Sequence, residues 1–155
     1  MKVYSVDVLL QEIPNEISLS FLITGCRNSC PNCHSPHLHS NIGDNINMQT
    51  FKEIILEYKD SITNVLFLGG EHLQNELSLY CSYVRSIGLK TAWYSGDDFF
   101  SKNESLINSL NYYKIGRYDE SKGGLSSPNT NQRLYEKKNN EWIDITYKLI
   151  KRHNR

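Results

Sequence analysis

Residues 19–39, LSFLITGCRNSCPNCHSPHLH, place an apolar run directly before three closely spaced cysteines. The run LSFLITG is short and ends in a glycine, which predicts a buried β-strand. Cys26, Cys30 and Cys33 follow it with the spacing C-x3-C-x2-C. The cysteines therefore lie on the loop that leaves the carboxyl end of a strand, where parallel α/β folds place their reactive groups.

Strand and helix patterns alternate along the rest of the chain. Further strands are predicted at Val65–Leu68, 90–96 and 112–118, and a hairpin at 133–146. Helices are predicted at 50–60, with Thr50 and Glu53 as a capping box, at 75–88, ending at Gly88, and at 101–110. Residues 119–132 are predicted to form a long loop. The alternation predicts an α/β fold with mainly parallel strands, either open or curled into a partial barrel. We expect one domain over residues 1–155, with a flexible tail from about 146 to 155.

Composition narrows the class of protein. The 155 residues are 39% hydrophobic and carry a formal net charge of zero, so no basic surface for nucleic acid is expected. The amino terminus has no long apolar run, which argues against a signal peptide or a membrane helix. We therefore expect a cytoplasmic protein, a setting in which clustered cysteines bind metals or do redox chemistry more often than they form disulfides.

Three kinds of metal site are compatible with the cysteine cluster. A structural zinc site would take His34, His37 or His39 as its fourth ligand. A simple electron-transfer cluster normally takes four cysteines, but Cys81 lies on the apolar face of a predicted helix and is expected to pack in the core. The third kind is a cluster with one iron left free of protein ligands, so that an outside molecule can bind it.

Two motifs together resemble the radical S-adenosylmethionine (SAM) superfamily. They are the three-cysteine loop after the first predicted strand and Gly69-Gly70-Glu71 after the next. The resemblance implies a partial, open (β/α) barrel and a [4Fe-4S] cluster held by Cys26, Cys30 and Cys33. It implies that the open iron chelates the amino and carboxylate groups of SAM and that the reduced cluster cleaves SAM to a 5′-deoxyadenosyl radical.

The resemblance also implies a set of residues that bind SAM. They are Asn32, Cys33 and His34 on the cysteine loop, Gly69, Gly70 and Glu71 on the following turn, and Ser95 after the third strand. Glycines let the backbone approach the SAM ammonium, and Glu71 supplies negative charge. The sequence departs from the superfamily at Asn32, where an aromatic residue is frequent, and at His72, where proline is frequent. His37 and His39 are expected to be surface or packing residues. Of Trp93 and Tyr94, one is expected to face the core and the other the site.

Further stretches are similar to the activating proteins of anaerobic (class III) ribonucleoside-triphosphate reductase. These stretches are CHSPHL (33–38), KTAWYSG (90–96) and GGLSSPNTNQRLY (123–135). The resemblance implies that the protein generates a glycyl radical on the large reductase subunit, with a flavodoxin-like electron donor. Two alternatives stay open: a radical SAM enzyme acting on a small molecule, such as a deazapurine synthase, and a non-catalytic metal-binding module. The sequence assigns no role to Asn131, Gln132 and Arg133.

Overall fold

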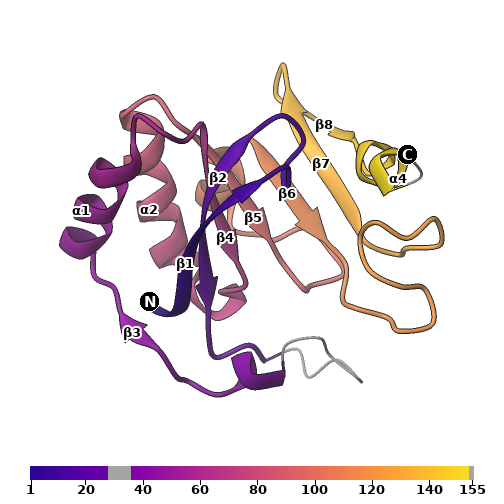
Figure 1. Ribbon diagram of the computed structural model, residues 1–155, viewed down its shortest axis with the longest axis horizontal. Coiled ribbons are helices and arrows are strands. Elements are labelled where there is room, and N and C mark those ends of the chain that lie inside the picture. Colours follow the sequence, from indigo (N-terminus) through magenta and orange to yellow (C-terminus); the bar gives the residue numbers. More distant parts are fainter. Residues whose placement is uncertain (28–35, 154–155) are drawn as a thin grey trace.

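A computed structural model describes residues 1–27 and 36–153 of the chain, which form a mixed α/β structure around one open sheet (Figure 1). The sheet has eight strands in the order β3-β1-β2-β4-β5-β6-β7-β8. The strands are β1 (Lys2–Leu10), β2 (Ile17–Ile23), β3 (Asp44–Asn45), β4 (Asn64–Leu68), β5 (Lys90–Tyr94), β6 (Tyr112–Ile115), β7 (Arg133–Lys138) and β8 (Glu141–Asp144).

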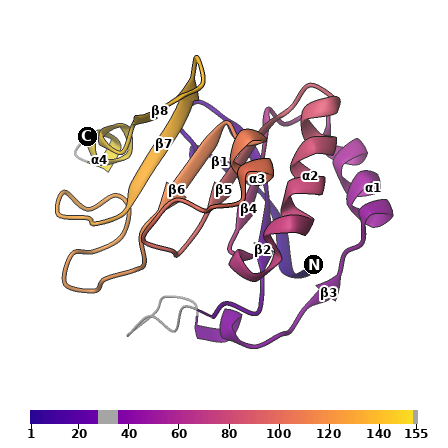
Figure 2. The same cartoon turned by 180° about the vertical axis from the view of Figure 1, so that it is seen from behind.

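Helices cover both faces of the sheet. The α-helices are α1 (Met48–Tyr58), α2 (Gln74–Ser86), α3 (Glu104–Asn108) and α4 (Tyr147–His153), and two 3₁₀ turns are η1 (Pro36–His39) and η2 (Glu71–Leu73). Helices α1, α2 and α3 lie on one face (Figure 2), and they occur between successive strands of the central sheet. The alternation of strand and helix predicted from the sequence is therefore confirmed.

Parallel pairing is confined to the middle of the sheet. Strands β2, β4, β5 and β6 pair in parallel, which gives three parallel pairings. The four outer pairings, β1 with β2, β1 with β3, β6 with β7 and β7 with β8, are antiparallel. The expectation of mainly parallel strands is therefore wrong for the sheet as a whole, because hairpins extend it on both sides. The sheet is open, with β3 and β8 at its edges, and partial-barrel character is not confirmed.

A separate apolar cluster lies on each face of the sheet. The larger cluster packs Phe51 of α1 and Tyr80 of α2 onto Phe21, Phe67 and Trp93 of the central strands. The smaller cluster contains Leu66, Ala92, Tyr112 and Leu134 together with Ile13 and Ile145, and Leu149 of α4 packs against it. The parallel strands are thus buried on both faces, as the continuous apolar runs of their sequences require.

Local sequence explains where the helices begin and end. The Asn47 side chain accepts a hydrogen bond from Thr50 N at 2.9 Å, so the N-cap of α1 is Asn47 and the predicted capping box at Thr50 is wrong. Gly88 has a φ of +85°, and its amide bonds to Arg85 O while Leu89 N bonds to Val84 O. This is a Schellman ending, and it confirms Gly88 as the stop of α2.

Two terminal segments were not recognised from the sequence. Strand β1 pairs with β2 along its length, whereas sequence analysis assigned no strand before residue 19. At the other end, Thr146 is fully buried and Tyr147–His153 forms α4, so the segment expected as a tail begins as a packed helix.

Candidate functional site

Predicted site residues from three loops meet at the carboxyl ends of the parallel strands. A cavity of about 190 Å³ is lined by Cys26 after β2, Gly69 and Glu71 after β4, and Ser95 after β5. These strands are parallel, so their carboxyl ends share an edge and bring the loops together. Cys30, Asn32, Cys33 and His34 lie outside the described residues.

The start of the cysteine loop is fixed by its own backbone. The amides of Gly25 and Cys26 both donate to Leu38 O, at 2.7 and 2.9 Å. Gly25 has a φ of +81°, and a Cβ there would lie 3.1 Å from His72 Nε2. The loop therefore packs closely on the turn that follows β4, and a side chain at position 25 would force the two apart.

The two glycines of the Gly69-Gly70 turn have different surroundings. Both residues have positive φ, +87° and +90°. Gly69 lines the cavity, and its carbonyl accepts from Trp93 Nε1 at 2.8 Å. A Cβ on Gly70 would lie 2.9 Å from Ile23 Cδ1 and 3.2 Å from Leu77 Cδ1. Gly70 thus packs against the core and is not among the residues that line the cavity, and its predicted contact with SAM stays a prediction.

One carboxylate oxygen of Glu71 accepts a hydrogen bond, and the other has no described partner. Its Oε1 accepts from Gly96 N at 2.7 Å, which joins the turn after β4 to the loop after β5. Its Oε2 is buried and has no hydrogen-bond partner among the described residues. An unsatisfied buried carboxylate oxygen is costly in a folded protein, so it indicates a place for a donor or a cation.

A buried lysine lies in the same cavity and was missed by sequence analysis. Lys114 of β6 is 8% exposed, and its Nζ donates to Ser95 O at 3.1 Å and to Gly116 O at 3.0 Å. Ser95 is fully buried, and its Oγ accepts from Asp97 N. In sequence Lys114 is a single charge inside the apolar run YYKI, a pattern that marks an inward-facing polar residue at a strand end.

The two histidines of η1 differ in their surroundings. His39 lines the cavity, and its Nε2 is buried with no hydrogen-bond partner among the described residues. His39 was expected to be a surface or packing residue, and its place in the wall of the cavity was not predicted. The His37 ring lies 4.8 Å from the Tyr4 ring, and His37 does not line this cavity.

Cys81 is separated from the site by the core. It is fully buried on α2, and burial raises the pKa of its thiol to about 12. A thiol that stays protonated is a poor metal ligand. The interpretation of Cys81 as a packing residue is confirmed. Within residues 1–27 and 36–153, no group of three or more histidine, cysteine, aspartate and glutamate side chains is placed to hold a metal.

Strand β5 and the segment before β7 supply further residues of the cavity wall. Trp93 is fully buried in the larger core cluster, while Tyr94 lines the cavity and donates to Glu12 O at 2.7 Å, so the predicted division between these neighbours is confirmed. Gln132, from the TNQRLY stretch, also lines the cavity. Asn131 beside it donates from Nδ2 to Arg117 O.

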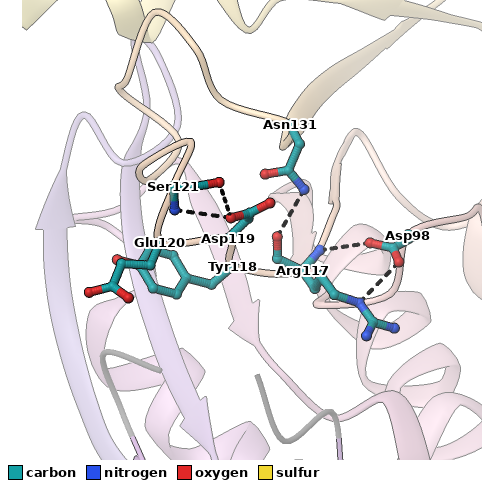
Figure 3. Close-up of a pocket in the computed structure, with 7 residues that line it drawn as sticks. All are labelled: Asp98, Arg117, Tyr118, Asp119, Glu120, Ser121 and Asn131. Atoms are coloured by element: carbon teal, nitrogen blue, oxygen red, sulfur yellow. Dashed lines mark hydrogen bonds and ion pairs between the residues drawn. The ribbon is translucent and has the colours of Figure 1, made fainter. Parts of the chain in front are cut away.

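A second and larger cavity adjoins the first. It has a volume of about 690 Å³ and is formed by the segments that follow β5 and β6, with Asp98, Arg117 and Asp119 among its lining residues (Figure 3). Arg117 Nε bonds Asp98 Oδ2 at 3.0 Å, and Asp119 accepts from both the amide and the hydroxyl of Ser121. Tyr118 lines both cavities, so the two share part of one wall.

Comparison with known proteins assigns the class of the site. The family model of the 4Fe-4S single cluster domain matches residues 17–139, most of the chain, and this protein belongs to that family. It is therefore an iron–sulfur protein with a 4Fe-4S cluster domain, which favours an iron–sulfur cluster over structural zinc at the cysteine loop. No curated protein and no solved structure matches the chain significantly.

The helices were also tested for membrane insertion. In the described part of the chain, none is both long and apolar enough to cross a membrane.

Proposed function

We propose that this iron–sulfur protein is a radical SAM enzyme in which Cys26, Cys30 and Cys33 hold the cluster and the cavity beside Cys26 holds SAM. The observation that carries the proposal is Glu71 Oε2, a buried anionic oxygen without a described partner in the cavity that Cys26 lines. A ligand with an ammonium group satisfies that oxygen, and SAM has such a group. When bound, the reduced cluster and SAM supply a carbon-centred radical able to take a hydrogen atom.

The residues around the cavity have separate tasks in this proposal. Glu71 accepts the ammonium, and its bond to Gly96 N fixes the carboxylate for that contact before SAM arrives. The apolar side chains of Leu22, Ile23 and Leu68 exclude water from the cavity wall. Ser95 and Gln132 supply further polar groups for the rest of the molecule.

We further propose that the hydrogen atom comes from the Cα of a glycine on the large subunit of an anaerobic ribonucleoside-triphosphate reductase. One electron from a flavodoxin-like donor and one SAM are consumed, and methionine, 5′-deoxyadenosine and the partner's glycyl radical are formed. Support comes from the resemblance at residues 123–135 and from Gln132 of that stretch, which reaches the cavity.

A reconstitution under anaerobic conditions tests this proposal. Purified protein, dithionite, SAM and the candidate reductase are mixed, and the radical is recorded by electron paramagnetic resonance. We expect a glycyl radical on the reductase and equal amounts of 5′-deoxyadenosine and radical. A reductase with its radical glycine changed to alanine is the control. Cleavage of SAM without a radical on the reductase would retain the radical SAM chemistry and contradict the activator role.

The second cavity favours one alternative, a small polar substrate. Its volume of about 690 Å³ lies within the range typical of small-molecule sites, and Tyr118 lines both this cavity and the proposed SAM site. Under this alternative the enzyme converts a free metabolite without any reductase. Arg117→Ala separates the two cases: it opens the Asp98 pair inside the cavity and lowers turnover of a small substrate. A protein substrate is expected to be less sensitive to the same change.

A further inference from the structure

His39 Nε2 and Glu71 Oε2 are two buried polar atoms without described partners, and both residues line the same cavity of about 190 Å³. Glu71 is assigned above to the ammonium of SAM. His39 has no role in that assignment. Buried polar side-chain atoms in folded proteins are almost always hydrogen-bonded, so the Nε2 atom of His39 is expected to bond to a ligand.

His39 and Glu71 line the cavity from different segments of the chain. The residue before His39 receives the amides of Gly25 and Cys26 on its carbonyl, so η1 is bound to the start of the cysteine loop. Glu71 is bound through its Oε1 to Gly96, which follows β5. The two unsatisfied atoms are thus held in the same cavity by two separate segments, η1 and the turn after β4.

The two atoms are chemically complementary. The Glu71 carboxylate oxygen only accepts, while an imidazole Nε2 donates in one neutral tautomer and in the protonated ring. An α-amino acid group, which carries an ammonium and a carboxylate on one carbon, needs one acceptor and one donor. Lys114 Nζ, another donor among the lining residues, already donates to Ser95 O and Gly116 O.

We propose that His39 Nε2 donates a hydrogen bond to the carboxylate of SAM. The inference rests on the proposed function, and it adds a binding residue outside the three-cysteine and Gly-Gly-Glu motifs. His39 and Glu71 then select together for a ligand with an intact amino acid end.

Binding measurements on three variants test the role of His39. His39→Leu removes the donor, His39→Gln keeps an N–H group at a similar reach, and His37→Leu is the matched control on the same turn outside the cavity. Each full-length protein is purified anaerobically, its iron and sulfide are counted, and its affinity is measured by calorimetry for SAM and for decarboxylated SAM, which lacks only the carboxylate.

A loss confined to one ligand is the expected result. His39→Leu should bind SAM about tenfold or more weakly, the size expected for one hydrogen bond to a charged group, with unchanged affinity for decarboxylated SAM and full iron content. His39→Gln should recover most of the affinity, and His37→Leu should resemble the unchanged protein.

Three results would overturn the inference. They are unchanged SAM affinity in His39→Leu, an equal loss for both ligands, and loss of iron in His39→Leu but not in His37→Leu. Because binding is measured without a reductase, failure of glycyl-radical formation leaves the role of His39 intact. A protein with its full cluster that does not bind SAM would remove both proposals.

Discussion

Glu16 and Glu71 lie at opposite ends of the same parallel strands, and only Glu16 has a hydrogen-bond partner on both carboxylate oxygens. Glu16 precedes β2 and is 6% exposed. Its Oε1 accepts from Lys90 Nζ at 2.6 Å and from Tyr112 OH at 2.7 Å, and its Oε2 accepts from Thr63 Oγ1 at 2.5 Å. These partners lie at or next to the starts of β4, β5 and β6, so Glu16 joins four strands at one end of the sheet.

Glu71 lies at the other end, where polar atoms stay unsatisfied. In the described part of the chain, five buried side-chain atoms have no hydrogen-bond partner. Four of them, Glu71 Oε2, His39 Nε2, His72 Nδ1 and Asn131 Oδ1, lie in segments near the carboxyl ends of the parallel strands, and the fifth, Asn64 Oδ1, lies at the start of β4. An unsatisfied buried group destabilises the free protein, and a ligand that satisfies it binds more tightly for that reason. The contrast indicates that one end of the sheet maintains the fold and the other binds a ligand.

The largest effect is expected from the cysteine loop. We predict that Cys26→Ala, Cys30→Ala and Cys33→Ala each abolish the cluster and SAM cleavage, because each removes one of the three proposed iron ligands. Iron analysis and the visible spectrum of the anaerobic proteins measure the first loss, and 5′-deoxyadenosine formation measures the second.

Cys81→Ala is the matched control, since Cys81 is buried in the core on α2. It should retain iron and cleavage at a modest cost in stability. Loss of iron in Cys81→Ala as complete as in Cys30→Ala would contradict the three-cysteine site.

The next effect is on stability, at the other end of the sheet. We predict that Glu16→Gln lowers the free energy of unfolding by about 2–4 kcal/mol, because three hydrogen bonds lose their charged acceptor and one amide donor faces other donors. The share of Lys90 is small, since its side chain is 52% exposed. Denaturant unfolding followed by circular dichroism measures the change. The SAM affinity of Glu16→Gln should equal that of the unchanged protein. If Glu16→Gln weakened SAM binding and left stability unchanged, the Glu16 end would be the one that binds the ligand.

The sequence was sufficient for the part of the fold that depends on local patterns. Apolar runs and helical periods identified the central strands, the three helices between them and the loop over residues 119–132. They also placed Cys26, Glu71 and Ser95 at one edge, because parallel strands that alternate with helices end on the same side. Periodicity further identified Cys81 as a core residue.

The missed features depend on contacts between distant segments. Strand β1 belongs to the sheet only through its pairing with β2, and its own sequence has a weak alternation. Lys114 and His39 became site residues only when β6 and η1 were placed beside the cavity. The close packing of Gly70 on Ile23 and Leu77 likewise depends on segments that are distant in sequence. Sequence spacing predicts which residues share a loop, and it does not predict which of them face inward.

The same substitution at the other glutamate should have the opposite outcome. We predict that Glu71→Gln weakens SAM binding about tenfold, because the amide that replaces Oε2 no longer attracts the ammonium. Folding stability should be unchanged or slightly higher, since the amide oxygen still accepts from Gly96 N and an unsatisfied buried charge is removed. Calorimetric titration and denaturant unfolding, applied to both glutamine variants, give the full comparison. A stability loss in Glu71→Gln as large as in Glu16→Gln would show that both ends maintain the fold.

The smallest effect is the pH dependence of the stability difference between the unchanged protein and Glu16→Gln. Burial raises the pKa of Glu16, but hydrogen bonds from Lys90, Thr63 and Tyr112 and the nearby Lys90 charge lower it more, so the pKa lies below its ordinary value of 4.5. A carboxyl group whose pKa is lowered by folding stabilises the protein fully above its unfolded pKa and loses that contribution as the pH falls through the folded pKa.

The difference should therefore be constant from neutral pH down to about 4.5 and should narrow in more acidic solution. Unfolding midpoints of both proteins, measured in parallel across this range, cancel the titration of every other group that the two share. A difference that stays constant in acid would mean that Glu16 contributes through shape and not through its charge. The stabilising role of Glu16 would then not depend on its charge, and charge would no longer explain why the Glu16 end stabilises the fold.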